Sequence, residues 1–271
     1  MKVFAIRDEE EYGSKDLAYL IYYESDKRFY IELPEDADPW ETPLLLSSFV
    51  KKGEKTVNAY WSKVWVQQRI VPTDRQNLGQ ILKENALSEY DEFELLMLAD
   101  GRCAQDSYYL VPINETIVMQ RFSDRYEKKV EDVIPLKNRG LLVFFRNGRV
   151  KRCNIDEMKK EDRFFIPVLA SEETFQKVAI QTGGYGVSWG ENAVIADSVL
   201  YDSGKDVPLS MDDFISFLSN RVISTAEAAE LLECSRQNVN DLVTRNKLHP
   251  VKTEPKNKFF LKSEILQRLW K

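Results

Sequence analysis

Short apolar runs separated by polar turns occupy the first 34 positions of the chain. They span residues 3–6, 17–23 and 29–33 and are rich in the β-branched and aromatic residues that strands favour. This pattern predicts a β-meander. Prolines then interrupt it between residues 34 and 43, and the apolar segment 44–50 fits either a helix or a buried strand.

From residue 61 the apolar positions follow a helical period. A first helix would begin at a capping box formed by Thr73 and Gln76. It would bury an apolar face formed by Leu78, Ile81 and Leu82. A second would be capped by Ser88, bury Phe93, Leu95, Leu96 and Leu98, and end near Asp100 and Gly101. We expect two short helices packed on the meander.

A second organised block covers residues 141–201. Asn147-Gly148 lies between two β-rich runs and predicts a hairpin with a type I′ turn, because both residues tolerate positive φ. Ser171 can cap a short helical turn, and further strands are expected at 179–181, 186–189 and 193–195. Gly183-Gly184 has no GK[ST] after it, so it predicts a tight turn and not a phosphate loop.

Residues 202–210 have the composition of a linker, and residues 211–219 form an amphipathic helical pattern. A hinge is expected there. Beyond it, Ser224 and Glu227 have capping-box spacing ahead of an alanine-rich helix. Ser235 can cap a second helix, which directs Val239, Leu242 and Val243 inward. The pattern is helix, tight turn, helix.

Two strands at 247–252 and 259–261, joined by a lysine-bearing loop at 253–258, predict a wing after the second helix. Ser263 would cap a last helix that packs back through Ile265, Leu266 and Leu269. Side chains that donate and accept hydrogen bonds can read base edges in the major groove, and lysines contact phosphates. The candidate DNA-binding residues are Thr225, Ser235, Arg236, Gln237, Asn238, Asn240, Arg245, Lys247, Lys252, Lys256 and Lys258. Asp241 could lie on the flank of this helix or pair with Arg245.

The segments STAEAAELLECSRQNVNDLVTRNKLHPV and KFFLKSEI together resemble the winged helix-turn-helix of MerR and excisionase proteins. The resemblance covers about 48 residues with the family's spacing, except that Glu233-Cys234 occupies the turn where the family usually has a glycine. It implies binding of double-stranded DNA. Because one such module contacts half of an operator, we also expect a homodimer.

Two further resemblances concern the rest of the chain. LLVFFRNGRVKRCNI and FQKVAIQTGGYGVSWGENAVIADSVLY resemble the bacterial domain of unknown function 2442, which implies a small α+β fold and no chemistry. The run LSEYDEFELLMLADGRCAQDSYYLVPI resembles the N-terminal subdomain of HipA-type kinases, through Asp91, Phe93, Leu95, Leu96, Gly101 and Cys103. Gln105-Asp106 departs from that pattern, and the chain has no histidine-centred catalytic loop, so no kinase activity is implied.

Composition narrows the function further. Residues 221–271 hold 10 Lys and Arg against 6 Asp and Glu, a net charge of +4, whereas the whole chain carries −6. The remaining 220 residues therefore carry −10, and a basic module follows an acidic body. A single histidine, His249, argues against a Ser-His-Asp triad or a histidine-rich metal site, and its place before Pro250 indicates a structural role.

Three isolated cysteines without CxxC spacing indicate reduced thiols in a cytoplasmic protein. No apolar run approaches the ~20 residues of a membrane helix, so no membrane insertion is expected. Trp61, Trp65 and Trp189 are expected as core or domain-interface anchors. We expect no enzyme activity, cofactor or metal.

These patterns predict a multidomain α+β protein. Its expected parts are a HipA-like domain (1–115), a small α+β domain (116–201), a linker and helix (202–220) and a winged helix-turn-helix (221–271). The leading hypothesis is a DNA-binding transcriptional regulator whose acidic body senses a ligand, dimerises or holds a protein partner. The alternative is an antitoxin-like or adaptor module that binds proteins without catalysis.

Overall fold

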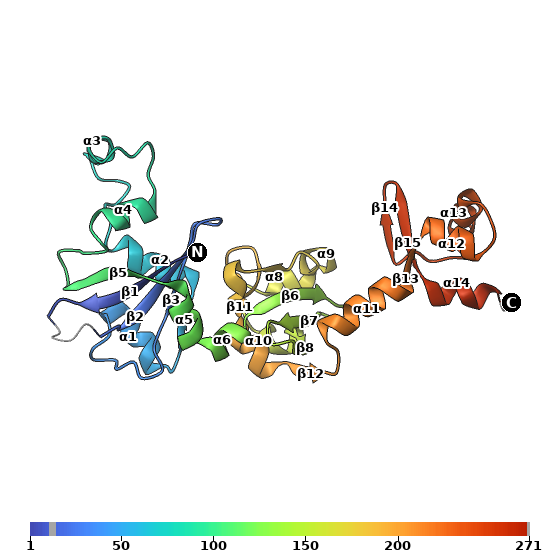
Figure 1. Cartoon of the computed structure of the whole chain (residues 1–271), viewed down its shortest axis with the longest axis horizontal. Coiled ribbons are helices and arrows are strands. Elements are labelled where there is room, and N and C mark those ends of the chain that lie inside the picture. The colour runs from blue at the N-terminus through green and yellow to red at the C-terminus, as the bar shows by residue number, and fades with distance from the viewer. Residues whose placement is uncertain (11–14, 270–271) are drawn as a thin grey trace.

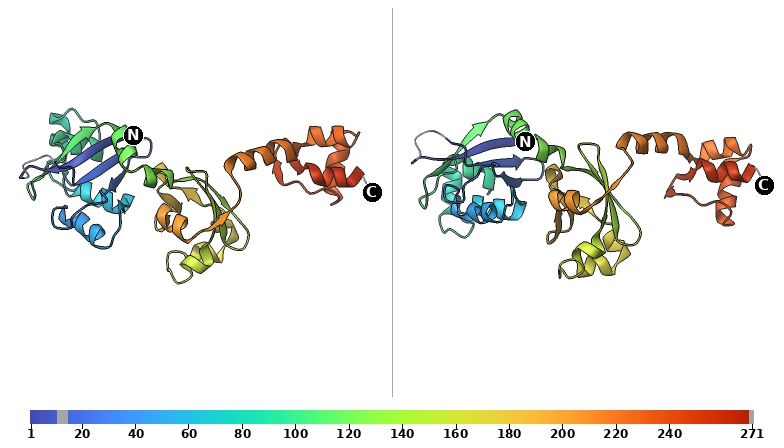
Figure 2. Two further views of the ribbon diagram at one scale, coloured as in Figure 1. Left: turned by 60° about the horizontal axis from the view of Figure 1, so that its bottom comes forward. Right: turned by 90° about the horizontal axis from the view of Figure 1, so that it is seen from below.

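Three lobes lie in a row in this multidomain α+β protein, and all three views keep them apart in the same order (Figures 1 and 2). The structure is a computed structural model that describes residues 1–10 and 15–269. None of the described helices combines the length and the apolar character needed to cross a lipid bilayer.

The first lobe is built on a five-stranded antiparallel sheet with strand order β4-β3-β2-β1-β5. The strands are β1 (Lys2–Asp8), β2 (Ala18–Tyr23), β3 (Arg28–Glu32), β4 (Thr56–Val57) and β5 (Tyr108–Ile113). The first three follow one another as antiparallel neighbours, so the predicted meander is confirmed. β5 pairs along β1 although the end of β1 at Asp8 and the start of β5 at Tyr108 are 100 positions apart, which closes the lobe.

Helices cover both faces of this sheet. They are α1 (Leu44–Lys51), α2 (Ala59–Gln67), α3 (Leu78–Glu84), α4 (Glu92–Leu98), α5 (Glu115–Arg121) and α6 (Ser123–Glu127). One face packs against Leu46, Trp65 and Phe93 of α1, α2 and α4, and the other packs against Val118 and Phe122 of the α5 region. The undecided segment at 44–50 is therefore a helix, and the first lobe extends past residue 115.

Four details of the first lobe differ from the sequence predictions. α3 begins at Leu78 after Asn77, without a side-chain cap, so the Thr73 capping box does not form. No residue of α3 is fully buried, and Figure 1 shows the helix standing away from the sheet. Asp91, and not Ser88, caps α4, because its carboxylate accepts the backbone N–H groups of Phe93 and Glu94. Leu98 is 51% exposed instead of buried.

The second lobe contains two small antiparallel sheets around one core. The first has the order β12-β8-β7-β6 and the second β11-β10-β9. The strands are β6 (Val130–Pro135), β7 (Gly140–Phe145), β8 (Val150–Asn154), β9 (Ala179–Ile180), β10 (Gly186–Trp189), β11 (Ala193–Ala196) and β12 (Lys205–Val207). The helices are α7 (Ile155–Lys159), α8 (Ile166–Ala170), α9 (Glu172–Phe175), the 3₁₀ turn η1 (Thr182–Gly184) and α10 (Asp197–Ser203). Aromatic rings fill the core, where Phe165 and Phe175 contact Trp189.

The hairpin between β7 and β8 is confirmed, but its turn is not type I′. Only Gly148 has a positive φ, of 77°, and Asn147 does not. Gly148 donates its N–H to the Phe145 carbonyl at 2.9 Å, and Phe145 donates to the Arg149 carbonyl at 2.9 Å. This is the three-residue loop in which a glycine follows an ordinary turn, which is the next most common hairpin connection.

Part of the expected linker belongs to the second lobe. β12 pairs antiparallel with β8, with Val207 opposite Val150. The free segment that follows is therefore shorter than predicted. It leads into α11 (Met211–Arg221), where Ser210 and Asp213 form a capping box.

The third lobe is a small helical module with a three-stranded sheet of order β13-β15-β14. Its elements are β13 (Val222–Ser224), α12 (Thr225–Leu231), α13 (Arg236–Thr244), β14 (Lys252–Glu254), β15 (Asn257–Leu261) and α14 (Lys262–Leu269). Its core includes Ile223, Val239 and Phe260, so the module has apolar packing of its own. α11 joins it to the other two lobes (Figure 1).

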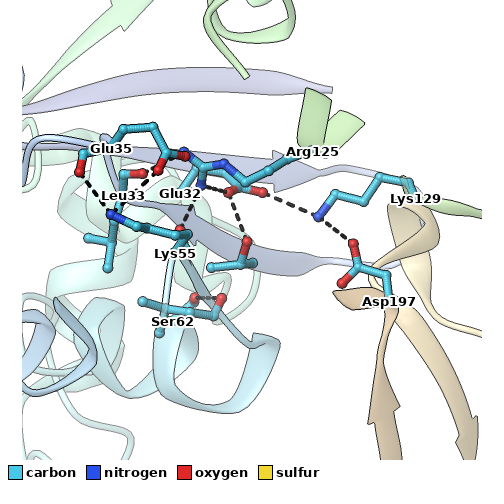
Figure 3. Close-up of polar contacts among 10 residues, drawn as sticks. Glu32, Leu33, Glu35, Lys55, Ser62, Arg125, Lys129 and Asp197 are labelled. Atoms are coloured by element: carbon cyan, nitrogen blue, oxygen red, sulfur yellow. Dashed lines mark hydrogen bonds and ion pairs between the residues drawn. The ribbon is translucent and has the colours of Figure 1, made fainter. Parts of the chain in front are cut away.

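A buried ionic network holds the first two lobes together (Figure 3). Glu32 of β3 is 3% exposed and accepts from Arg125 Nη1 at 2.7 Å. The ammonium of Lys129 lies between two carboxylates, 3.4 Å from Glu32 Oε1 and 3.1 Å from Asp197 Oδ2. Tyr185 of the second lobe stacks on Tyr30 of the first, with ring centroids 3.8 Å apart. Because these contacts are buried, the two lobes form one body.

Candidate nucleic-acid interface

The helix-turn-helix of the third lobe is set by its caps. Ser224 accepts the Glu227 N–H, and the Glu227 carboxylate accepts the Ser224 N–H at 2.8 Å, which is the predicted capping box. These bonds stabilise the carboxylate and lower the pKa of Glu227. Ala228 and Ala229 are buried, and their small side chains allow α13 to approach α12 closely.

The turn between α12 and α13 places a charged residue in the left-handed region. Glu233 has φ 50°, and the next residue, Cys234, donates its N–H to the Ala229 carbonyl at 3.0 Å. This conformation costs a non-glycine residue roughly 1–2 kcal/mol. The chain therefore makes the turn expected at this position without the usual glycine.

α13 begins at its predicted cap and presents a polar face. Ser235 Oγ accepts the Asn238 N–H at 3.1 Å, so this hydroxyl is engaged in starting the helix. Val239 is fully buried, and Leu242 and Val243 pack beside it as predicted. The opposite side of the helix is exposed and carries Arg236, Gln237, Asn238, Asn240, Asp241, Thr244 and Arg245.

The wing is confirmed, but its first strand begins later than expected and its second begins earlier, at Asn257. Its first strand begins at Lys252 and not at residue 247, and Glu254 pairs with Asn257. Most of the predicted 253–258 loop is therefore strand, and the turn is Pro255-Lys256. β13, which the sequence did not suggest, pairs with the other side of β15.

Between the start of α13 and the wing lies an open cavity of about 500 Å³. Its lining includes Arg236 and Asn240 from α13 and Lys256 and Lys258 from the wing. Asn240 Oδ1 accepts from Lys258 Nζ at 2.9 Å, which ties the helix to the wing across this cavity. Together with Thr225, five of the predicted DNA-binding residues thus line one concave surface.

Thr225 also lines this cavity, but it is only 7% exposed and both of its hydroxyl bonds are internal. Its Oγ1 donates to the Lys258 carbonyl at 3.1 Å and accepts the Lys258 N–H at 3.2 Å. The hydroxyl is therefore engaged within the lobe, and a contact of Thr225 with DNA stays a prediction. Thr225 positions the wing against α12, across a separation of 33 residues.

The cations of the third lobe differ in their neighbours. Lys252 is paired with Glu254 at 2.6 Å. Within residues 1–10 and 15–269, no ion pair involves Arg236, Arg245, Lys247 or Lys256, and the expected Asp241–Arg245 pair does not form. All four side chains are exposed. Their charge is therefore available to an external anion.

The last helix braces the segment between α13 and the wing. Glu264 Oε1 lies 2.9 Å from His249 Nδ1 and accepts the His249 N–H at 3.0 Å. Arg268 donates to the Lys247 carbonyl at 3.0 Å. α14 starts at Lys262, so Ser263 lies inside the helix and is not its cap. Ile265 is buried as predicted, whereas the side chain of Leu269 lies outside the described residues.

The described residues offer no preformed metal centre, since they contain no group of three or more His, Cys, Asp or Glu side chains placed to hold an ion. The glycine pair at 183–184 forms the predicted tight turn, with φ values of 71° and 79°. Trp65 and Trp189 are buried, but Trp61 is 41% exposed. Among the described residues of the third lobe, the candidate binding feature is therefore the concave surface between α13 and the wing, with its unpaired cations.

No protein-family model matches the chain. No curated protein matches it either. Among solved structures, the chain is similar to a provisionally named DNA-binding protein from Nitrosomonas europaea, with 25% identity and a TM-score of 0.26. The match covers 45% of this chain and 79% of that one.

Proposed function

We propose that this chain is a DNA-binding transcriptional regulator whose third lobe reads the major groove. The observation that carries the proposal is the exposed polar face of α13, which opens beside the wing on a cavity with unpaired cations. The acidic body would sense a ligand or hold a partner. A reducing, cytoplasmic setting is supported by three free cysteines, of which buried Cys153 has its pKa raised to about 11 by burial.

The spacing on α13 suits direct base readout. Arg236 and Asn240 are four residues apart, so they project from the same side of the helix. Arginine can bond the O6 and N7 acceptors of guanine, and asparagine can bond adenine at N6 and N7. For Asn240 to bind adenine in this way, Lys258 Nζ must leave its hydrogen bond to Asn240 Oδ1 and turn to a phosphate. Lys256 at the wing turn would contact the backbone and contribute affinity without sequence information.

The test is a selection from genomic DNA of the source organism followed by anisotropy titration of the enriched duplex. We expect Arg236→Ala and Asn240→Ala each to weaken binding about 5- to 150-fold, the equivalent of ~1–3 kcal/mol for a bidentate base contact. Lys256→Ala should weaken binding to specific and random duplexes alike and reduce the salt slope by about 0.9. Arg152→Ala, an exposed arginine of the body, is the matched control. Unchanged affinity in both α13 variants would remove the proposed reading helix.

A second candidate function is that of an antitoxin-like or adaptor protein. Trp40 is 86% exposed and Leu44 is 89% exposed on the first lobe, and apolar side chains this open favour a protein partner. Under this alternative, a purified complex would contain a stoichiometric partner that Trp40→Ala releases, and heparin or DNA columns would not retain the chain in a salt-dependent way. Salt-sensitive retention without a partner would favour the regulator.

A further inference from the structure

α11 connects the acidic body to the basic module and has an apolar side that the described residues leave largely exposed. None of its 11 residues is buried. Ile215 is 52% exposed, Phe217 48% and Leu218 41%, while Phe214 lies against Phe144 of the second lobe with ring centroids 5.7 Å apart. Figures 1 and 2 show the helix crossing the space between two lobes.

The helix separates its side chains by character. Projected at 100° per residue, the apolar residues occupy an arc of about 160°. Arg221 lies within this arc, and the other polar residues lie outside it. The apolar set is Met211, Phe214, Ile215, Phe217 and Leu218, and the polar set is Asp212, Asp213, Ser216, Ser219 and Asn220. Isolated helices shorter than ~12–15 residues are marginal in water, so a helix of this length needs packing on its apolar side.

The charges of α11 limit what can cover that side. Its polar face carries carboxylates and no lysine or arginine, which disfavours both an anionic membrane and the DNA backbone. Asp212 and Asp213 lie in the first turn and Arg221 in the last. Two antiparallel copies centred on Phe217 would place each Arg221 on the same flank as the partner's Asp213.

We propose that α11 pairs antiparallel with α11 of a second copy and forms the dimer interface of this protein. The use of this dimer, two reading helices on one duplex, rests on the proposed function, but its geometry does not. The area that the three exposed apolar side chains can bury is smaller than the ~800 Å² per partner of a typical stable interface. Free dimers are therefore weak, and a duplex that holds two modules strengthens them by raising the effective concentration.

Sedimentation equilibrium of the full chain without DNA tests the pairing. The wild-type mass rises from that of the 31.6 kDa monomer toward a dimer as the concentration approaches about 0.5 mM. Leu218→Asp weakens this association at least tenfold, whereas Ser216→Asp on the polar face leaves it unchanged. Leu218 is exposed, so thermal unfolding of the variant stays as in the wild type. A monomer at every concentration, or a dimer that Leu218→Asp leaves intact, overturns the proposal.

Cysteine cross-linking tests the direction of the pairing. Leu218→Cys lies one residue from the twofold axis and near the middle of the apolar arc, so oxidation gives a disulfide-linked dimer. Met211→Cys, six residues from the axis, places the two thiols about 18 Å apart in an antiparallel pair but in contact in a parallel one. Ser216→Cys controls for chance collisions. Efficient cross-linking through 211 or 216, or none through 218 above the wild-type level, contradicts the geometry.

The two proposals fail separately. If Leu218→Asp leaves the dimer unchanged while Arg236→Ala weakens DNA binding, the interface is wrong and the reading helix stands. If Leu218→Asp dissociates the dimer while Arg236→Ala and Asn240→Ala retain full DNA affinity, the interface stands and the reading helix is wrong.

Discussion

Lys129 allows the sharpest prediction about the body of the protein. Its side chain is 4% exposed, and its ammonium lies 3.1 Å from Asp197 and 3.4 Å from Glu32. Lys129→Met keeps the length of the side chain and removes the charge. Glu32 retains Arg125 at 2.7 Å, but Asp197 loses its cation while still buried. Leaving a buried charge without its partner typically costs ~3–5 kcal/mol, so we expect the free energy of unfolding to fall by about 3 kcal/mol or more.

Urea unfolding at pH 7, followed by tryptophan fluorescence and by circular dichroism, measures the loss. Lys128→Met is the matched control, because Lys128 is the neighbouring lysine and is exposed. We expect its effect to stay within about 0.5 kcal/mol. Adding Asp197→Asn to Lys129→Met should restore part of the stability, since the unpaired carboxylate is then absent. A loss below about 1 kcal/mol for Lys129→Met would refute the reasoning.

The loss should also depend on pH in a defined direction. Burial raises the pKa of Asp197 above its ordinary value even with Lys129 present, and removing the ammonium raises it further. Between the unfolded and folded pKa values the native state holds a proton that the unfolded chain releases. Stability then falls as the pH rises through this window. The deficit of Lys129→Met relative to the wild type should therefore be smaller at about pH 5 than at pH 7.

Two further predictions concern backbone conformation. Glu233→Gly should raise the free energy of unfolding of the third lobe by about 1 kcal/mol, because glycine adopts positive φ without a steric cost. Glu230→Gly, inside α12, should lower it by about 1 kcal/mol. Thermal melts of both variants test this, and a loss of stability in Glu233→Gly would contradict the argument. Gly183→Ala should destabilise more than Gly148→Ala by roughly 1–3 kcal/mol. Both glycines have positive φ, but of the two added Cβ atoms only the one at 183 would clash, with Tyr23 Oη. Equal losses in urea unfolding would show that the contact with Tyr23 yields.

Whether a contact could be predicted from the sequence depended on how far apart its residues lie along the chain. The caps at Ser224 and Ser235 act over three residues, and both were predictable from residue type and spacing. At α4 the carboxylate of Asp91 takes the place predicted for Ser88, because Asp91 directly precedes the helix. The Asn147-Gly148 pair predicted a hairpin, but the type of turn depended on the register of its strands.

Interactions between distant residues carried no local signal. Thr225 looks like a polar residue at the start of an exposed helix, and only its bonds to Lys258, 33 positions away, show that it is internal. β12 has the composition of a linker and becomes a strand because β8 offers a free edge. The Lys129 network joins residues from three separate segments, and each of them alone resembles an ordinary surface charge.

The uneven distribution of charge connects these features with the proposed function. The first 220 residues carry a net charge of −10, so they are repelled by a phosphate backbone, whereas the third lobe with +4 is attracted to it. Under the proposed function, this bias would orient an encounter with DNA so that the face of α13 leads and the body trails. The first two lobes are joined by buried contacts, and α11 carries the module away from them (Figure 1). A ligand or partner that binds the body can therefore influence DNA binding most directly through α11, by changing its direction or its pairing.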